Sequence, residues 1–166
     1  MARIFYTLSV LYILSSILLS CSGSDDDNQK PRIDNFRVGD TILIGDSVIN
    51  YIYADLSDNG GLSTFRIQIM PSPSMQKPDS VVRDSFALQK HIRRWSFFGK
   101  DTATLNTGFV VPSISSYYDK TTGKSTNYPT RTGEYILRYS CIDLAGNQDS
   151  SEVSITILYP KKQVTE

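Results

Sequence analysis

Residues 133–159, GEYILRYSCIDLAGNQDSSEVSITILY, decide the fold of this chain. In the first half apolar residues such as Tyr135 and Leu137 alternate with polar ones, and the second half alternates in the same way. A period of two with many β-branched and aromatic residues is typical of half-buried strands. Residues 145–147, AGN, separate the halves, and Gly and Asn accept the positive φ that tight turns require. The stretch therefore predicts the closing hairpin of an all-β domain.

Further strands are predicted upstream of this hairpin. Alternation or β-branched enrichment predicts them at residues 32–38, 47–55, 62–70, 93–98 and 104–114. Residues 58–61, DNGG, are a strong turn signal, so we expect the strands on either side of them to form a hairpin. Residues 84–92 predict a short helix or an irregular strand, and the polar residues 115–132 predict a long loop. About seven antiparallel strands in one domain favour an immunoglobulin-like β-sandwich.

Charge and composition exclude several classes of function. The chain has 166 residues, 40% of them hydrophobic, with 17 basic and 17 acidic side chains and a formal net charge of zero. Proteins that bind nucleic acids normally present a basic face to the phosphates, so we expect no nucleic-acid partner. The single histidine, His91, lies among basic residues and is expected in a solvated loop. Without a second histidine a catalytic triad or a zinc site is not favoured, and we expect no enzymatic activity.

The N-terminus has the features of a cleaved signal peptide. In residues 1–20, one basic residue precedes an apolar run that is short for a membrane span and ends in small residues. Residues 18–21, LLSC, resemble a bacterial lipobox, which implies cleavage before Cys21 and acylation of this residue. Two or more acyl chains would anchor the protein stably in a membrane. Cys141 then has no partner for an intradomain disulfide, and we expect it to be a small buried hydrophobe.

The remaining chain divides into a tether, a domain and a tail. Residues 21–30 are predicted to be a flexible acidic tether, residues 31–160 the β-sandwich and residues 161–166 a C-terminal tail. The tether is also similar to the acidic export signal of Bacteroidetes-type lipoproteins. That resemblance implies an outer-membrane protein facing the cell exterior; the alternative is a spacer that only clears the lipid headgroups.

The closing hairpin carries a second resemblance. Gly133-Glu134-Tyr135, followed by residues 141–147, CIDLAGN, resembles the final strand pair of bacterial Ig-like domains. Over residues 31–159 the chain is similar to domain-of-unknown-function family 4625, a family of Bacteroidetes-type lipoproteins. The resemblance implies the Ig-like fold and the lipid anchor, and it implies nothing about an activity.

Hard oxygen donors are predicted to gather at one end of the sandwich. These candidate calcium ligands are Asp55, Asp58, Asn59, Asp143 and Asn147. Ca²⁺ takes six to eight oxygen ligands, although neither turn has the spacing of an EF-hand. The alternative is that these side chains cap turns and strand ends. A pair of carboxylates could also serve a glycosidase, which we favour least.

Aromatic side chains in the middle of the chain form a candidate ligand-binding site. Its members are Trp95, Tyr117, Tyr118 and Tyr128. Aromatic faces beside polar groups suit a glycan or a protein partner, while the alternative for Trp95 is a place in the core. We therefore expect a membrane-anchored, non-enzymatic binding or accessory module. The alternatives are a purely structural envelope protein and a calcium-stabilised adhesion module; exposed tyrosines favour binding and buried ones a structural role.

Overall fold

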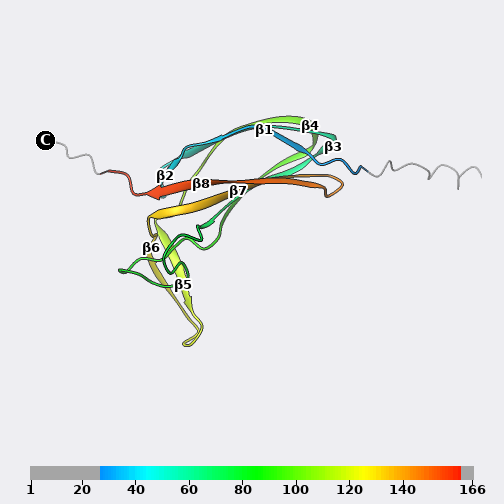
Figure 1. The fold of residues 1–166 in the computed structure, drawn as a ribbon. Coiled ribbons are helices and arrows are strands. Elements are labelled where there is room, and N and C mark those ends of the chain that lie inside the picture. Colours follow the sequence, from blue (N-terminus) through cyan, green and yellow to red (C-terminus); the bar gives the residue numbers. More distant parts are fainter. Residues whose placement is uncertain (1–26, 162–166) are drawn as a thin grey trace, which may run out of the picture.

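The computed structural model describes residues 27–161 as an all-β fold (Figure 1). Its strands are β1 (Arg32–Val38), β2 (Thr41–Leu43), β3 (Asn50–Pro71), β4 (His91–Phe109), β5 (Ile114–Asp119), β6 (Lys124–Pro129), β7 (Gly133–Asp143) and β8 (Gln148–Leu158). Within the described residues, no helix has the length and hydropathy needed to span a bilayer. The predicted signal peptide and Cys21 lie outside the described residues.

Two long, bent strands connect the layers of the sandwich. The N-terminal half of β3 pairs with β1 and with the C-terminal half of β4, and its C-terminal half pairs with β7 and the N-terminal half of β4. Strand β7 continues the second layer by pairing with β8, and β2 lies parallel to β8 at the edge. Hydrogen bonding therefore runs from one layer into the other (Figure 1). The prediction of an Ig-like β-sandwich is confirmed.

The predicted hairpin across residues 58–61 is wrong. Strand β3 continues through the DNGG segment, where its register to β4 shifts between Ser57 and Leu62. Its register to both β4 and β7 shifts again between Leu62 and Thr64. Gly61 has a φ of +97°, so the chain bends there without reversing. Bulges with glycine bend a strand while preserving its pairing, and both halves of β3 keep β4 as a common neighbour.

Two other predictions about the middle of the chain are also wrong. Residues 115–132 do not form a loop, because β5 and β6 make an antiparallel hairpin there. The Asp119 carboxylate closes its turn by accepting hydrogen bonds from the Thr121 N–H and the Thr122 hydroxyl, both at 2.8 Å. This hairpin projects from the sandwich, which agrees with its many polar residues. Its Tyr and Thr residues nevertheless have a high preference for β-strands. Residues 93–98 and 104–114 do not form separate strands, because β4 runs through both to Phe109. Residues 84–92 contain no helix, and the isolated bridges of Ser85 and Phe86 agree with the alternative expected there, an irregular strand.

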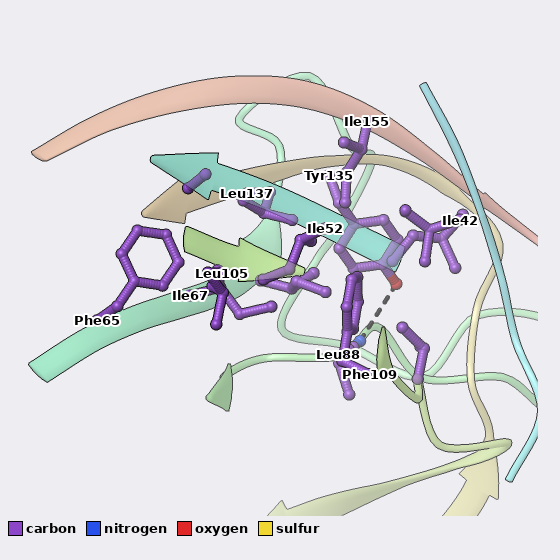
Figure 2. Close-up of a cluster of buried hydrophobic side chains, with 14 of the residues drawn as sticks. Ile42, Ile52, Phe65, Ile67, Leu88, Leu105, Phe109, Tyr135, Leu137 and Ile155 are labelled. Atoms are coloured by element: carbon purple, nitrogen blue, oxygen red, sulfur yellow. Dashed lines mark hydrogen bonds between the residues drawn. The ribbon is translucent and has the colours of Figure 1, made fainter. Parts of the chain in front are cut away.

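The core lies between the two layers and confirms the alternation of the closing hairpin. Tyr135 and Leu137 of β7 are fully buried against Ile52 and Phe65 of β3 (Figure 2). Cys141 is also fully buried, as predicted, and this burial raises the pKa of its thiol to about 11. The inward faces of β3 and β7 thus supply most of the contacts that hold the layers together.

Candidate functional site

Most of the predicted site residues gather at two opposite ends of the sandwich, while Asp55 and Trp95 lie apart from them. At one end, here called the entry end, the described chain begins at Asp27 beside the turn between β7 and β8 (Figure 1). At the other end the β5–β6 hairpin projects from the body of the domain (Figure 1).

Three carboxylates converge at the entry end. Oxygens of Asp27, Asp58 and Asp143 lie within 4.8 Å of one another, and we call these residues the carboxylate cluster. Asp143 is only 2% exposed. Its carboxylate accepts hydrogen bonds from the Asn147 backbone N–H at 2.7 Å and from Asn147 Nδ2 at 2.8 Å. Asn59 Nδ2 donates to Asp27 Oδ1 at 3.2 Å, so both amide side chains support the cluster.

Among residues 27–161, two oxygens of the carboxylate cluster have no hydrogen-bond donor. Asp27 Oδ2 and Asp58 Oδ1 are both buried and both unpaired. Loss of solvent raises the pKa of Asp58, and the negative charges of Asp143 and Asp27 raise it further. A buried, unpaired carboxylate oxygen is costly, and a cation is the partner that would satisfy both atoms and the excess charge. Carboxylate and amide oxygens are the ligands that Ca²⁺ prefers.

The structure brings together four of the residues predicted for calcium and separates one. Asp58, Asn59, Asp143 and Asn147 belong to the carboxylate cluster or contact it. Asp55 is instead held by Asn35, Tyr53 and Thr104, whose side chains donate hydrogen bonds of 2.9, 2.9 and 3.0 Å to its carboxylate. These bonds lower the pKa of Asp55, that from Asn35 most.

Asp27 is the cluster residue that the sequence did not predict. It belongs to the acidic run assigned to the flexible tether, yet its backbone carbonyl accepts a 2.7 Å hydrogen bond from Asn147 Nδ2. The available signal was an acidic run just ahead of the first strand, but only the fold places Asp27 beside Asp58 and Asn59. Asp27 thus contacts the sandwich although it precedes the first strand by five positions.

Three of the four predicted aromatic residues gather at the far end. Tyr117 and Tyr118, together with Phe86, line an open groove of about 510 Å³. The Tyr117 ring packs edge-on against Phe86, at a centroid distance of 5.1 Å, and against Tyr128, at 6.4 Å. Tyr118 is 58% exposed. Polar lining residues of the groove include Asp79, Gln89 and Lys120.

Trp95 and His91 lie elsewhere, both on β4. The Trp95 ring packs against Phe65 at a centroid distance of 6.1 Å and is partly buried on the core, which agrees with the alternative considered for it. The prediction that His91 lies in a solvated loop is wrong. Its ring Nε2 lies 2.9 Å from the Val110 carbonyl, and burial, followed by the charge of Arg93, lowers its pKa.

Comparisons with known proteins find one family and several distant structures. A family model described as Domain of unknown function (DUF4625) matches residues 19–158. OgpA from Akkermansia muciniphila is 13% identical, with a TM-score of 0.41, over 78% of this chain and 29% of that chain. The β-glucosidase DesR from Streptomyces venezuelae, in complex with D-glucose, is 14% identical, with a TM-score of 0.39, over 76% of this chain and 15% of that chain.

A third structure is the CARDB domain of a Pyrococcus furiosus protein in complex with di-metal ions. It is 9% identical, with a TM-score of 0.33, over 82% of this chain and 99% of that chain. These similarities are to β-rich domains and carry no argument about activity. No curated protein sequence is significantly similar to this chain.

Proposed function

We propose a function from one premise: this chain belongs to the family described as Domain of unknown function (DUF4625). Membership of this family does not define an activity, so we infer the function from the groove and the carboxylate cluster. The protein is an outer-membrane lipoprotein, anchored through Cys21 and facing the cell exterior, whose Ig-like domain is a non-enzymatic accessory module. Its β5–β6 hairpin binds a glycan.

The observation that carries this proposal is the groove at the far end. Tyr118 exposes 58% of its surface beside polar side chains that include Gln89 and Lys120. An exposed aromatic face with convergent polar groups suits a sugar ring, which has an apolar face and hydroxyls at its edge. Aromatic contacts with Phe86 and Tyr128 hold the Tyr117 ring in place. The groove is therefore formed before a ligand binds, and its side chains lose little conformational entropy on binding.

The placement of the groove supports an outward-facing binding role. Cys21 precedes Asp27 by only six positions, so an anchor at Cys21 holds the entry end close to the membrane. The β5–β6 hairpin projects at the opposite end of the sandwich (Figure 1). An anchored molecule would therefore present the groove to the exterior.

The test is a thermal melt of a lipid-free chain that begins at Ser22 against a panel of glycans. A ligand at a hundred times its dissociation constant adds about 2.7 kcal/mol, which for a domain of this size raises Tm by roughly 5 to 10 °C. Tyr118→Ala should remove the shift. Tyr51→Ala is the matched control, because Tyr51 is a similarly exposed tyrosine outside the groove, at 65%. A flat panel, or a shift that survives Tyr118→Ala, contradicts glycan binding here and favours a protein partner or a structural role.

A second observation favours calcium as a stabilising cofactor of the same module. The carboxylate cluster holds two buried oxygens, on Asp27 and Asp58, that find no donor in the part of the chain that the structure describes. They lie next to the almost fully buried Asp143. One Ca²⁺ would pair these oxygens and join the first described residues to the body of the sandwich. Isothermal titration with calcium tests this, and an absence of heat at millimolar calcium contradicts it.

A further inference from the structure

Two exposed apolar side chains occupy neighbouring segments at the entry end. Phe98 of β4 is 93% exposed, and Leu144, in the turn after β7, is 63% exposed. A Cβ added to Gly99 would lie 3.1 Å from Leu144 Cδ1, so Leu144 covers the residue next to Phe98. The Leu144 backbone N–H donates a 2.9 Å hydrogen bond to the Gly61 carbonyl, which fixes the turn against the bend in β3. We call Phe98 and Leu144 the apolar tip.

The backbone conformation that exposes Phe98 to solvent is energetically unfavourable. Its φ is +54°, in the left-handed region that side chains with a Cβ rarely adopt. It lies in a bulge, because Lys100 pairs with Leu62 while Ser96 pairs with Thr64. Phe98 thus combines an unfavourable backbone conformation with an exposed aromatic ring. Contacts within the described residues do not compensate for the free-energy cost of either. Strain of this kind is retained where it serves a function.

The chain that leads to the proposed anchor leaves from the same end. The Asp27 backbone carbonyl accepts a hydrogen bond from Asn147, in the turn that also holds Leu144. From Asp27, Cys21 is six positions upstream, a separation that a fully extended chain spans in about 20 Å. An acylated Cys21 would therefore keep the apolar tip within reach of the bilayer surface.

We propose that Phe98 and Leu144 insert into the lipid surface beside the protein's own anchor and dock the entry end on the membrane. This inference rests on the proposed anchoring through Cys21. A phenylalanine and a leucine suit the boundary between headgroups and acyl chains. Lys100, exposed on β4 two residues beyond Phe98, supplies a cation for lipid phosphates.

The anchor makes this small contact effective. Two side chains alone bind a membrane weakly, but an anchor at Cys21, six positions from Asp27, makes their contact intramolecular and raises its effective concentration. The contact would limit rotation of the domain about its tether. The groove on the β5–β6 hairpin would then be held away from the bilayer.

The test uses the acylated full-length mature protein in phosphatidylcholine vesicles that contain brominated lipid. The chain has a single tryptophan, so Trp95→Phe gives a silent background into which Phe98→Trp places a reporter. Docking predicts a blue-shifted emission that the brominated lipid quenches severalfold. Tyr118→Trp in the same background is the control at the far end and should not be quenched. Thermal melts confirm that each variant is folded.

Two outcomes overturn the inference, and they are distinguishable. If the protein floats with the vesicles but Phe98→Trp is quenched no more than Tyr118→Trp, docking is refuted while the anchor stands. If the acylated protein does not float, the anchor fails, and docking beside it fails too. Cys21→Ser, which removes the acylation site, sets the baseline for flotation.

Discussion

The phenolic oxygen of Tyr135 donates a 2.7 Å hydrogen bond to the backbone carbonyl of Arg131, four residues upstream. The same oxygen accepts a 3.2 Å hydrogen bond from the Leu88 N–H (Figure 2). The ring itself is fully buried, and this burial raises the pKa of the phenol. A tyrosine near the start of this strand, bonded back to the preceding connection, is a hallmark of Ig-like sandwiches. One side chain thus joins the core to two connecting segments.

Replacing this hydroxyl should destabilise the fold. Tyr135→Phe keeps the ring but leaves the Leu88 N–H and the Arg131 carbonyl without their partner, at a cost of about 1–3 kcal/mol. Urea unfolding followed by circular dichroism measures the loss. Tyr51→Phe, on a tyrosine that is 65% exposed, is the control and should change the free energy of unfolding little. Equal effects of the two substitutions would contradict the role given to Tyr135.

Removing the charge of Asp58 should have opposite effects with and without calcium. Because the pKa of Asp58 is raised above its ordinary value of 3.8, the folded state binds more protons than the unfolded state. Its contribution to stability therefore falls as pH rises through the window above 3.8. In EDTA at neutral pH, Asp58→Asn should raise Tm. Calcium should raise the Tm of the unaltered chain, and the same variant should lose this increase.

Asp55→Asn is the matched control for the calcium experiment. Hydrogen bonds, first that from Asn35, lower the pKa of Asp55, so its contribution to stability is present above its ordinary value of 3.8 and is lost as pH falls through its folded-state pKa. Asp55→Asn should lower Tm in EDTA and keep the response to calcium. A calcium response abolished by Asp55→Asn and kept by Asp58→Asn would contradict the assignment of the cluster.

The thiol of Cys141 should be inert in the folded protein. Burial raises its pKa to about 11, and the thiolate is the reactive form. A lipid-free chain that begins at Ser22 keeps Cys141 as its single cysteine. It should resist iodoacetamide at pH 8 and react fully in urea. Rapid stoichiometric labelling without denaturant would mean that β7 opens readily.

An exposed ion pair and a core residue should differ greatly in their contribution to stability. Arg138 of β7 and Glu152 of β8 form a salt bridge, but their side chains are 47% and 42% exposed. A double-mutant cycle to alanine should give a coupling of about 0.2–1 kcal/mol. Ile67→Ala, at a fully buried position of β3, should cost about 2–5 kcal/mol. A coupling as large as the Ile67→Ala loss would contradict this ranking.

Where the sequence pattern is regular and one face is buried, the predictions from it are confirmed. The alternation over residues 133–159 predicted β7 and β8, and Tyr135 and Leu137 do face the core. The pattern failed at residues 58–61 and in the hairpin of β5 and β6. The DNGG sequence permits a bend or a reversal equally well, and β5 and β6 have too few buried residues to stand out from a polar loop.

Some residues of the candidate sites could be predicted from the sequence, and others could not. The sequence predicted four of the residues at the carboxylate cluster, because side chains that carry oxygen ligands stand beside the predicted turns. These residues are Asp58, Asn59, Asp143 and Asn147. Asp27 could not be predicted, since its contact with Asn147 joins positions 120 residues apart. Asp55 and Asp58 are close in sequence, yet one is held by Asn35 and Thr104 while the other faces the cluster.

The sequence by itself determined the strand periodicity, the closing hairpin and the residue types at each end of the domain. Those features depend on side-chain alternation and turn preference, which act over a few residues. The tertiary structure alone decided that β3 bends instead of reversing, that Asp27 completes the carboxylate cluster and that Phe98 is exposed beside Leu144. Each of these depends on pairing between distant segments, and such pairing is chosen by the burial and hydrogen bonding of the whole fold rather than by any one stretch of residues.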